Sequence, residues 1–289
     1  MKPIIVLPTS SAKYLAKKLS RQTRNIKIIF PDLNRDKKRH FPDGEVYARI
    51  PESHSFRGKR IIVLHSGAPK PNEGLVELEL ILQILRDNKV RPEVFFAYFP
   101  YSMQDKVFEK GETNVAENLT EKLINFYRVK KIYIIDPHFK GRAWVKKYPI
   151  ISLSAVPLLI EKAKKDLGNE DLVILSPDKG GKRRTKISGF KKQRLNSFDV
   201  KMSVSKVNLR GKAIGVVDDM IKTGGTLLKF CELAKKAKAK KVIALITHGV
   251  MPKGISRIKK NYSKLYLTNT IERKESNIDV TDLIVENIF

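Results

Sequence analysis

The sequence predicts an α/β protein built from two similar domains in tandem, each a mostly parallel sheet flanked by helices. Three observations lead to this prediction: short apolar runs alternate with segments of helical periodicity, one such run returns later in the chain, and polar residues gather where the runs end. Continuous rather than alternating apolar runs are typical of parallel strands that helices cover on both faces.

The expected strands are short runs rich in branched and aromatic side chains. They are Ile4–Leu7, Ile61–Leu64, Val94–Phe99, Ile132–Ile135, Leu172–Leu175, Ala213–Val217, Val242–Ile246 and Leu265–Leu267. Helical periodicity marks Ser11–Leu19, Leu75–Leu85 and Val156–Lys165, and a further helix opens near Thr226.

Polar residues follow most of the expected strands. They are Thr9–Ser11, His65-Ser66, Asp136–His138, Ser176–Asp178, Asp218-Asp219 and Thr247-His248. Ligands of open α/β sheets bind outside the carboxyl ends of the strands, so these positions are candidate site residues. For any one of them taken alone, the alternative is a polar cap of a loop.

An internal repeat links the two halves of the chain. Gly58–Leu64 resembles Gly211–Val217 at an offset of 153 residues, and the apolar positions of the helices that follow also align. We therefore expect domains at residues 1–147 and 148–289, with the boundary near Tyr148-Pro149, because proline disfavours helix in the preceding residue. The first copy, His65–Asn72, has no loop that matches Asp218–Thr226 of the second, which predicts that the second copy kept a phosphate site that the first lost.

Composition narrows the class of protein further. The 58 Lys and Arg residues against 30 Asp and Glu residues give a net charge of +28, which suggests phosphorylated partners. The basic residues are scattered, without a dedicated arm or interleaved aromatics, so we do not expect nucleic acid as a partner. A single cysteine, Cys231, fits a reducing compartment. No run approaches the ~18 apolar residues of a membrane span, and we expect a cytoplasmic protein.

The segment from residue 215 to 228 carries the most specific chemistry. A buried strand ends in Asp218 and Asp219, a small loop Lys222–Thr226 follows, and then a helix opens. Free backbone N–H groups and the dipole at a helix start bind phosphate, while the two carboxylates accept hydrogen bonds from vicinal hydroxyls. A phosphate next to a diol predicts ribose 5-phosphate. The alternative is an Asp-rich turn with a threonine N-cap.

This loop resembles the phosphoribosyl diphosphate loop of phosphoribosyltransferase-fold proteins, which implies two phosphoribosyltransferase-like domains. Further segments across nearly the whole chain resemble ribose-phosphate pyrophosphokinase, in its archaeal rather than its bacterial form. They are Phe41–Glu45, Tyr98–Lys106, Asp136–His138, Ser176–Gly181, Lys192–Arg194, Thr247–Val250 and Thr268–Ile271.

The resemblance implies transfer of the β,γ-diphosphate of ATP to the 1-hydroxyl of ribose 5-phosphate, with Mg²⁺ as cofactor and self-association into a dimer or larger oligomer. It also implies the role of each matching residue. Phe41, Asp43, Gly44, Glu45, Gln104 and Asp105 would bind ATP; His138 and Asp178 would hold the metal; Lys192 and Arg194 would be catalytic; Arg194, Asp218, Asp219, Lys222, Thr223, Gly224, Gly225 and Thr226 would bind ribose 5-phosphate.

The chain departs from the family pattern at a few positions. Met103 stands where arginine is usual, Lys222 where many relatives have an acid, and Phe139 follows the expected metal histidine. Two alternatives are therefore kept: a non-catalytic regulatory paralogue that binds nucleotide or sugar phosphate, and a nucleic-acid-binding member of the fold. For single residues the alternatives are a core aromatic at Phe41 and solvated basic side chains at Lys192 and Arg194.

Overall fold

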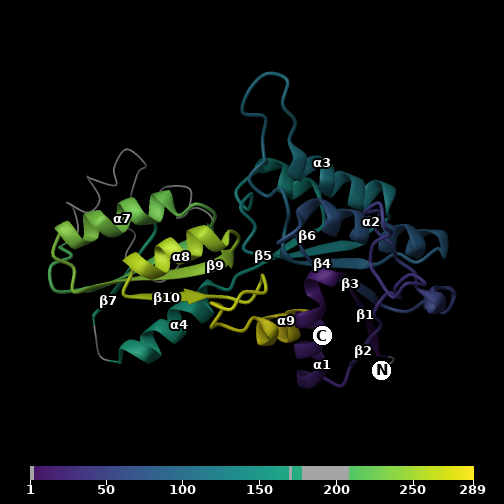
Figure 1. The fold of residues 1–289 in the computed structure, drawn as a ribbon, viewed down its shortest axis with the longest axis horizontal. Coiled ribbons are helices and arrows are strands. Elements are labelled where there is room, and N and C mark those ends of the chain that lie inside the picture. Colours follow the sequence, from purple (N-terminus) through teal and green to yellow (C-terminus); the bar gives the residue numbers. More distant parts are fainter. Residues whose placement is uncertain (1–2, 169–170, 178–207) are drawn as a thin grey trace. The chain divides into compact units, whose positions relative to one another are not determined.

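The computed structural model describes residues 3–168, 171–177 and 208–289 and divides the chain into two compact units (Figure 1). The first unit is Met1–Leu153 with Thr281–Phe289, and the second is Ser154–Val280. The division thus follows Leu153 rather than residue 147, because the strand after Pro149 pairs with the first sheet. The C-terminal residues also belong to the first unit, and not to the second domain as the sequence suggested. No helix in the described ranges is both long and apolar enough to cross a membrane.

The first unit contains a parallel sheet with strand order β2-β1-β3-β4-β5-β6. Its strands are β1 (Ile4–Pro8), β2 (Ile26–Ile28), β3 (Ile61–Ser66), β4 (Glu93–Tyr98), β5 (Lys131–Ile135) and β6 (Ile150–Leu153). Its helices are α1 (Lys13–Gln22), α2 (Pro71–Asp87), α3 (Val115–Glu121) and α9 (Thr281–Ile288), with single 3-10 or π turns at Ser10–Ala12, Pro51–Phe56, Lys122–Phe126 and Ala143–Lys147.

Helix α9 returns to the first unit and packs against α1. Gln22 of α1 donates to the carboxylate of Asp282 at 2.9 Å, and the guanidinium of Arg60 donates to the carbonyl of Ile288 at 2.8 Å. Buried apolar residues of α9, including Ile284, complete the contact. The end of the chain is therefore part of the framework of the first unit.

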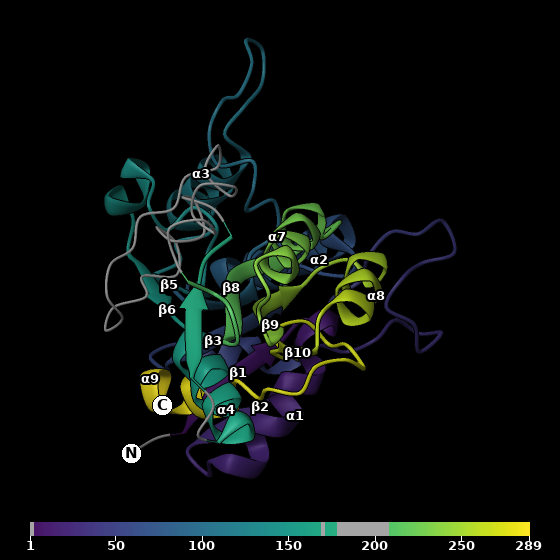
Figure 2. The ribbon, with the colours of Figure 1, turned by 90° about the vertical axis from the view of Figure 1, so that its left-hand side faces the viewer.

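The second unit contains a parallel sheet with strand order β10-β9-β8-β7. Its elements are α4 (Val156–Leu167), β7 (Leu172–Leu175), β8 (Ala213–Ile221), α7 (Gly225–Lys236), β9 (Lys241–Gly249), α8 (Pro252–Asn261) and β10 (Lys264–Leu267). Helices α7 and α8 cover one face and α4 covers the other, as Figures 1 and 2 show. Two apolar clusters fill these layers, one around Val216 and Phe230 and one around Val217 and Leu159. The expected α/β class is confirmed.

The internal repeat is visible in the backbone. Strands β1-β3-β4-β5 of the first sheet have the same order as β7-β8-β9-β10 of the second. The glycine before the repeated strand is left-handed in both copies, with φ of 76° at Gly58 and 75° at Gly211. In both copies a lysine with a left-handed backbone comes just after the next helix, Lys89 after α2 and Lys238 after α7. The two copies therefore share local geometry as well as topology.

Candidate functional site

Polar residues at the carboxyl ends of the strands are buried in both units. They are Thr9, His65, Ser66, Asp136, Ser176, Asp218, Asp219, Thr247 and His248. Several of them belong to the strands themselves rather than to the loops, since β3 includes His65, β8 includes both aspartates and β9 includes His248. Because parallel strands end at one edge, each unit gathers its polar residues there. For the residues that lie inside a strand, the interpretation as simple loop caps is wrong.

The acid pair lies near the end of β8, with Asp218 8% and Asp219 2% exposed. Successive side chains of a strand point to opposite faces. Asp218 shares the face of α7 and α8, where burial raises the pKa of Tyr262 and the negative charges of Cys231 and Asp218 raise it further. Asp219 therefore belongs to the α4 face, and its backbone N–H donates to the Asp218 carboxylate at 3.0 Å. The two carboxylates bracket the strand end from two sides.

The loop after β8 opens directly into α7. Its N-cap is Gly224 in the left-handed region at φ 78°, and no side chain caps the helix. The first N–H groups of an α-helix have no partner within the helix, and the dipole makes this end positive. Thr223, Gly225 and Thr226 are exposed, so a ligand can reach these groups. The alternative of a threonine N-cap is wrong, and the geometry is that of an anion site.

Helix α8 packs against this loop at one glycine. A Cβ on Gly254 would lie 1.8 Å from the carbonyl oxygen of Lys222, so only glycine allows this approach. The guanidinium of Arg257 donates to the carbonyl of Thr223 at 3.0 Å. Neither residue belongs to a motif in the sequence, although a lone glycine inside a helix is a signal of close packing. Helix α8 therefore fixes the position of the loop.

A hydroxyl network joins the ends of β9 and β10. The hydroxyls of Thr268 and Thr270 both donate to the carbonyl of Thr247, at 2.5 and 2.9 Å. Nδ1 of His248 lies 2.9 Å from the Thr270 hydroxyl and joins the same network. The two late segments of the family pattern thus form one connected edge of the second sheet.

In the first unit, Phe41–Glu45 form the tip of a tight hairpin. The N–H of Phe41 donates to the carbonyl of Glu45 at 2.8 Å, the Asp43 carboxylate accepts from the N–H of Glu45 at 3.0 Å, and Gly44 has φ 95°. The Phe41 ring is 41% exposed and touches Tyr47 edge-on, with the centroids 5.6 Å apart. The alternative of a core aromatic at Phe41 is wrong, and its ring is available to a ligand.

Arg39 anchors this hairpin, although the sequence analysis did not single it out. Its buried guanidinium donates to the carbonyls of Pro31, Asp32 and Tyr47 at 2.7–3.0 Å. Its Nε lies 3.3 Å from the carboxylate of Glu77 on α2. A buried charge with this many partners fixes the backbone on both sides of the hairpin.

In the segment Tyr98–Lys106, the side chains are not all placed as the family pattern implies. Met103, 40% exposed, and Gln104 face solvent. Asp105 is buried, and its carboxylate accepts two bonds from Arg142, at 2.7 and 3.0 Å. Both Asp105 oxygens are thus paired within the protein, which makes its visible role the support of this segment. Phe139, which departs from the family pattern, packs in the core, with its ring centroid 5.0 Å from that of Phe99.

The structure describes only one of the expected metal and catalytic residues, His138. His138 is half-buried just after β5, and Asp136 before it has φ 37°, an uncommon conformation for a residue with a side chain. Asp178, Lys192 and Arg194 lie outside the described residues. Within the described ranges no three His, Cys, Asp or Glu residues form a cluster for a metal. Mg²⁺ takes few protein ligands, mainly oxygens, and keeps several waters, so the lack of such a cluster among the described residues is compatible with this ion.

Comparisons with known proteins cover almost the whole chain. The family model described as the N-terminal domain of ribose phosphate pyrophosphokinase matches residues 4–126, and that of the phosphoribosyl transferase domain matches residues 151–283. A ribose-phosphate pyrophosphokinase of Pyrococcus abyssi is 32% identical over 99% of this chain and 98% of its own length. One from Thermococcus kodakarensis is 32% identical over 84% of this chain and 88% of its own. The crystal structure of a phosphoribosylpyrophosphate synthetase from Mycobacterium smegmatis has the same fold, with a TM-score of 0.79, 21% identity and coverage of 99% and 98% of the two chains.

Proposed function

The chain belongs to the ribose-phosphate pyrophosphokinase family and is an enzyme of that family, and from this premise we propose that it transfers the β,γ-diphosphate of MgATP to the 1-hydroxyl of ribose 5-phosphate. The products are AMP and phosphoribosyl diphosphate. The observation that carries this proposal is the open helix start at Gly224–Thr226 beside the two aspartates of β8.

The sugar phosphate would bind in the second unit. Its 5-phosphate accepts hydrogen bonds from the N–H groups of the loop Lys222–Thr226, where the helix dipole and the Lys222 ammonium favour an anion. Asp218 and Asp219 would repel a phosphate but accept hydrogen bonds from the two ring hydroxyls. Charge alone therefore orients the sugar, with its phosphate on the loop and its diol on the acids.

The nucleotide would bind through the first unit. The exposed ring of Phe41 can stack on adenine, and the carboxylate of Glu45 and the amide of Gln104 can hydrogen-bond the nucleoside or its phosphates. Asp43 and Gly44 would act mainly by shaping the hairpin that presents Phe41. For Asp105 we propose a supporting role, because Arg142 already uses both of its oxygens.

In the reaction, the 1-hydroxyl oxygen of the sugar forms a bond to the β-phosphorus and the bond from the β-phosphorus to the AMP oxygen breaks. Such transfers depend on positioning and on neutralising charge over the phosphate oxygens. Lys192 and Arg194 would supply positive charge that is strongest in the transition state. His138 and Asp178 would hold Mg²⁺, which when bound neutralises charge on the transferred diphosphate.

Phosphorus NMR tests the proposal directly. With ribose 5-phosphate, ATP and Mg²⁺, the protein should form AMP and phosphoribosyl diphosphate in equal amounts. No AMP at any Mg²⁺ concentration, with ribose 5-phosphate still bound, would instead identify a regulatory paralogue. Lys192→Ala should lower kcat on the order of 100-fold or more while ribose 5-phosphate binding changes little, and the neighbouring Lys191→Ala serves as the matched control.

Two further properties belong to the same proposal. We expect the enzyme to work in the cytoplasm, since its one cysteine is a buried free thiol and phosphorylated metabolites are its substrates. We also expect it to self-associate as a dimer or a larger oligomer, which light scattering coupled to gel filtration can measure.

A further inference from the structure

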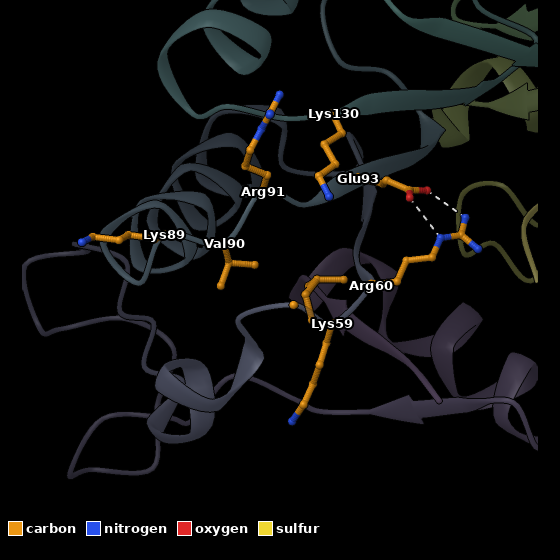
Figure 3. Close-up of a pocket in the computed structure, with 9 residues that line it drawn as sticks. Lys59, Arg60, Lys89, Val90, Arg91, Glu93 and Lys130 are labelled. Atoms are coloured by element: carbon orange, nitrogen blue, oxygen red, sulfur yellow. Dashed lines mark hydrogen bonds and ion pairs between the residues drawn. The ribbon is translucent and has the colours of Figure 1, made fainter. Parts of the chain in front are cut away.

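The amino ends of the strands in the first unit carry a second polar feature, far from the residues discussed above. A hollow of ≈ 460 Å³ is lined by the residues just before β3, β4 and β5 (Figure 3). A neighbouring hollow of ≈ 360 Å³ shares Lys89, Val90 and Arg91 with it. We call the two together the basic hollow, defined by its cations. These are Lys59, Arg60, Arg86, Lys89, Arg91, Arg128 and Lys130.

The basic hollow has a large excess of positive charge. Among the described residues that line it, the only acid is Glu93, which accepts two bonds from Arg60, at 3.0 and 2.8 Å, and this pairing raises the pKa of Arg60 (Figure 3). None of the other cations of the hollow forms an ion pair with another described residue. Elsewhere in the unit many cations have carboxylate partners, such as Lys122 with Glu79 and Lys147 with Glu117. The hollow thus brings together six cations for which the described residues provide no carboxylate partner.

Helix ends explain only part of this charge. Lys89 follows α2 and Arg128 follows the π turn after α3, and helix carboxyl ends attract cations. Both residues have a left-handed backbone, with φ of 57° and 59°, a conformation that glycine adopts with less strain than lysine or arginine. Lys59, Arg91 and Lys130 precede strands, where no helix end accounts for a cation. Clustered like charges repel one another, and a ligand of opposite charge would reduce this repulsion.

We propose that the basic hollow binds a linear oligophosphate, a ligand with at least three linked phosphate groups. Neighbouring strands are about 4.8 Å apart, so the segments before β3, β4 and β5 present cations in a row roughly 10 Å long, which suits a chain of phosphates. No aromatic side chain lines either hollow, so a base would find no stacking partner there. Lysine and arginine are the donors that bind phosphate oxygens most strongly.

This site is independent of the proposed reaction. The substrate residues lie at the carboxyl ends of the strands, and the basic hollow lies at the amino ends of β3, β4 and β5. A six-residue strand such as β3 separates the two edges by roughly 17 Å. Substitutions in the hollow should therefore leave turnover of ATP and ribose 5-phosphate unchanged.

Calorimetric titration with inorganic triphosphate tests the proposal. Because the ATP site can also accept this ion, the wild-type protein should show two classes of sites. In the double variant Arg91→Glu, Lys130→Glu one class should weaken by about 100-fold, since two charged hydrogen-bond donors are lost. Its kcat and its KM for ATP should stay at the wild-type values. The double variant Lys17→Glu, Arg24→Glu makes the same change in net charge on an exposed surface outside the hollow and should bind as the wild type does.

Chemical modification gives a second, site-resolved measurement. Triphosphate should protect Lys59, Lys89 and Lys130 from acetylation, as read by mass spectrometry, and leave Lys17 reactive. Equal binding by the wild type and the Arg91→Glu, Lys130→Glu variant would overturn the proposal. An equal loss of triphosphate binding in the Lys17→Glu, Arg24→Glu control would also overturn it, because the effect would then come from net charge alone. Tighter binding of a single-stranded oligonucleotide than of triphosphate through the same lysines would replace the oligophosphate site with a nucleic-acid surface.

Discussion

The close approach of Gly254 to the loop Lys222–Thr226 gives the first prediction. In Gly254→Ala the new Cβ would lie 1.8 Å from the carbonyl oxygen of Lys222, whereas such contacts essentially never fall below 3.0 Å. The loop or the helix must therefore move by at least the difference, about 1.2 Å. A misplacement of about 1 Å in a positioning group can cost on the order of 100-fold. We expect kcat/KM for ribose 5-phosphate to fall by about that factor.

Stability should change much less than binding. Overpacking costs about 1–3 kcal/mol, and replacing glycine by alanine inside a helix returns up to about 1 kcal/mol. Thermal unfolding measures the change in stability, and calorimetric titration with ribose 5-phosphate measures the change in affinity. Lys253→Ala on the exposed side of the same helix is the matched control and should change neither.

Arg257→Met, which removes the bond to Thr223, should raise KM only severalfold, because that bond is exposed. A folded Gly254→Ala protein that binds ribose 5-phosphate normally would refute the role of α8.

Three further substitutions test other parts of the structure. Asp105→Asn should lower the free energy of unfolding by about 3 kcal/mol, because the paired carboxylate is buried against Arg142; weaker ATP binding without a loss of thermal stability would contradict this. Met103→Arg should tighten ATP binding up to about tenfold in a calorimetric titration, since it adds one exposed cation. Burial lowers the pKa of His65 to about 3, while an unfolded histidine titrates near 6.5, so the unfolded chain gains a proton first and stability falls as pH drops from about 6.5 toward 3. His65→Gln should remove about 2 kcal/mol of that loss between pH 7 and pH 5, and identical pH slopes in chemical denaturation would exclude this explanation.

Continuous apolar runs predicted eight of the ten described strands, because burial on both faces leaves a strong signal in the sequence. Leu172–Leu175 has the expected bounds, while β8 extends past Val217 to Ile221 because Asp218, Met220 and Ile221 still pair with β9. The prediction missed β2, whose middle residue Lys27 is charged and which has a neighbour on one side only. It also missed that β6 is an edge strand, since Pro149 was interpreted as a domain boundary.

The site was predictable only where its residues are consecutive in the sequence. The loop Lys222–Thr226 could be interpreted directly because strand, acids, glycines and helix follow one another. Gly254 and Arg39 could not, because each acts on a segment from another part of the chain, through a contact that only the folded backbone creates. The pairing of Asp105 with Arg142 escaped for the same reason, and it changes the role expected of Asp105.

Comparison of the two copies gives a reason why the proposed phosphate site is in the second copy and not in the first. At the offset of 153 residues, His65 stands where the second copy has Asp218, and a buried neutral imidazole cannot replace an ionised carboxylate as an acceptor for a sugar diol. Helix α2 begins with Pro71, which has no N–H, whereas α7 begins with Gly225. The first-copy loop is also closed, since a Cβ on its Gly67 would lie 2.6 Å from Pro100. Three local changes thus remove the acceptor, a donor and the space, while strand order stays the same.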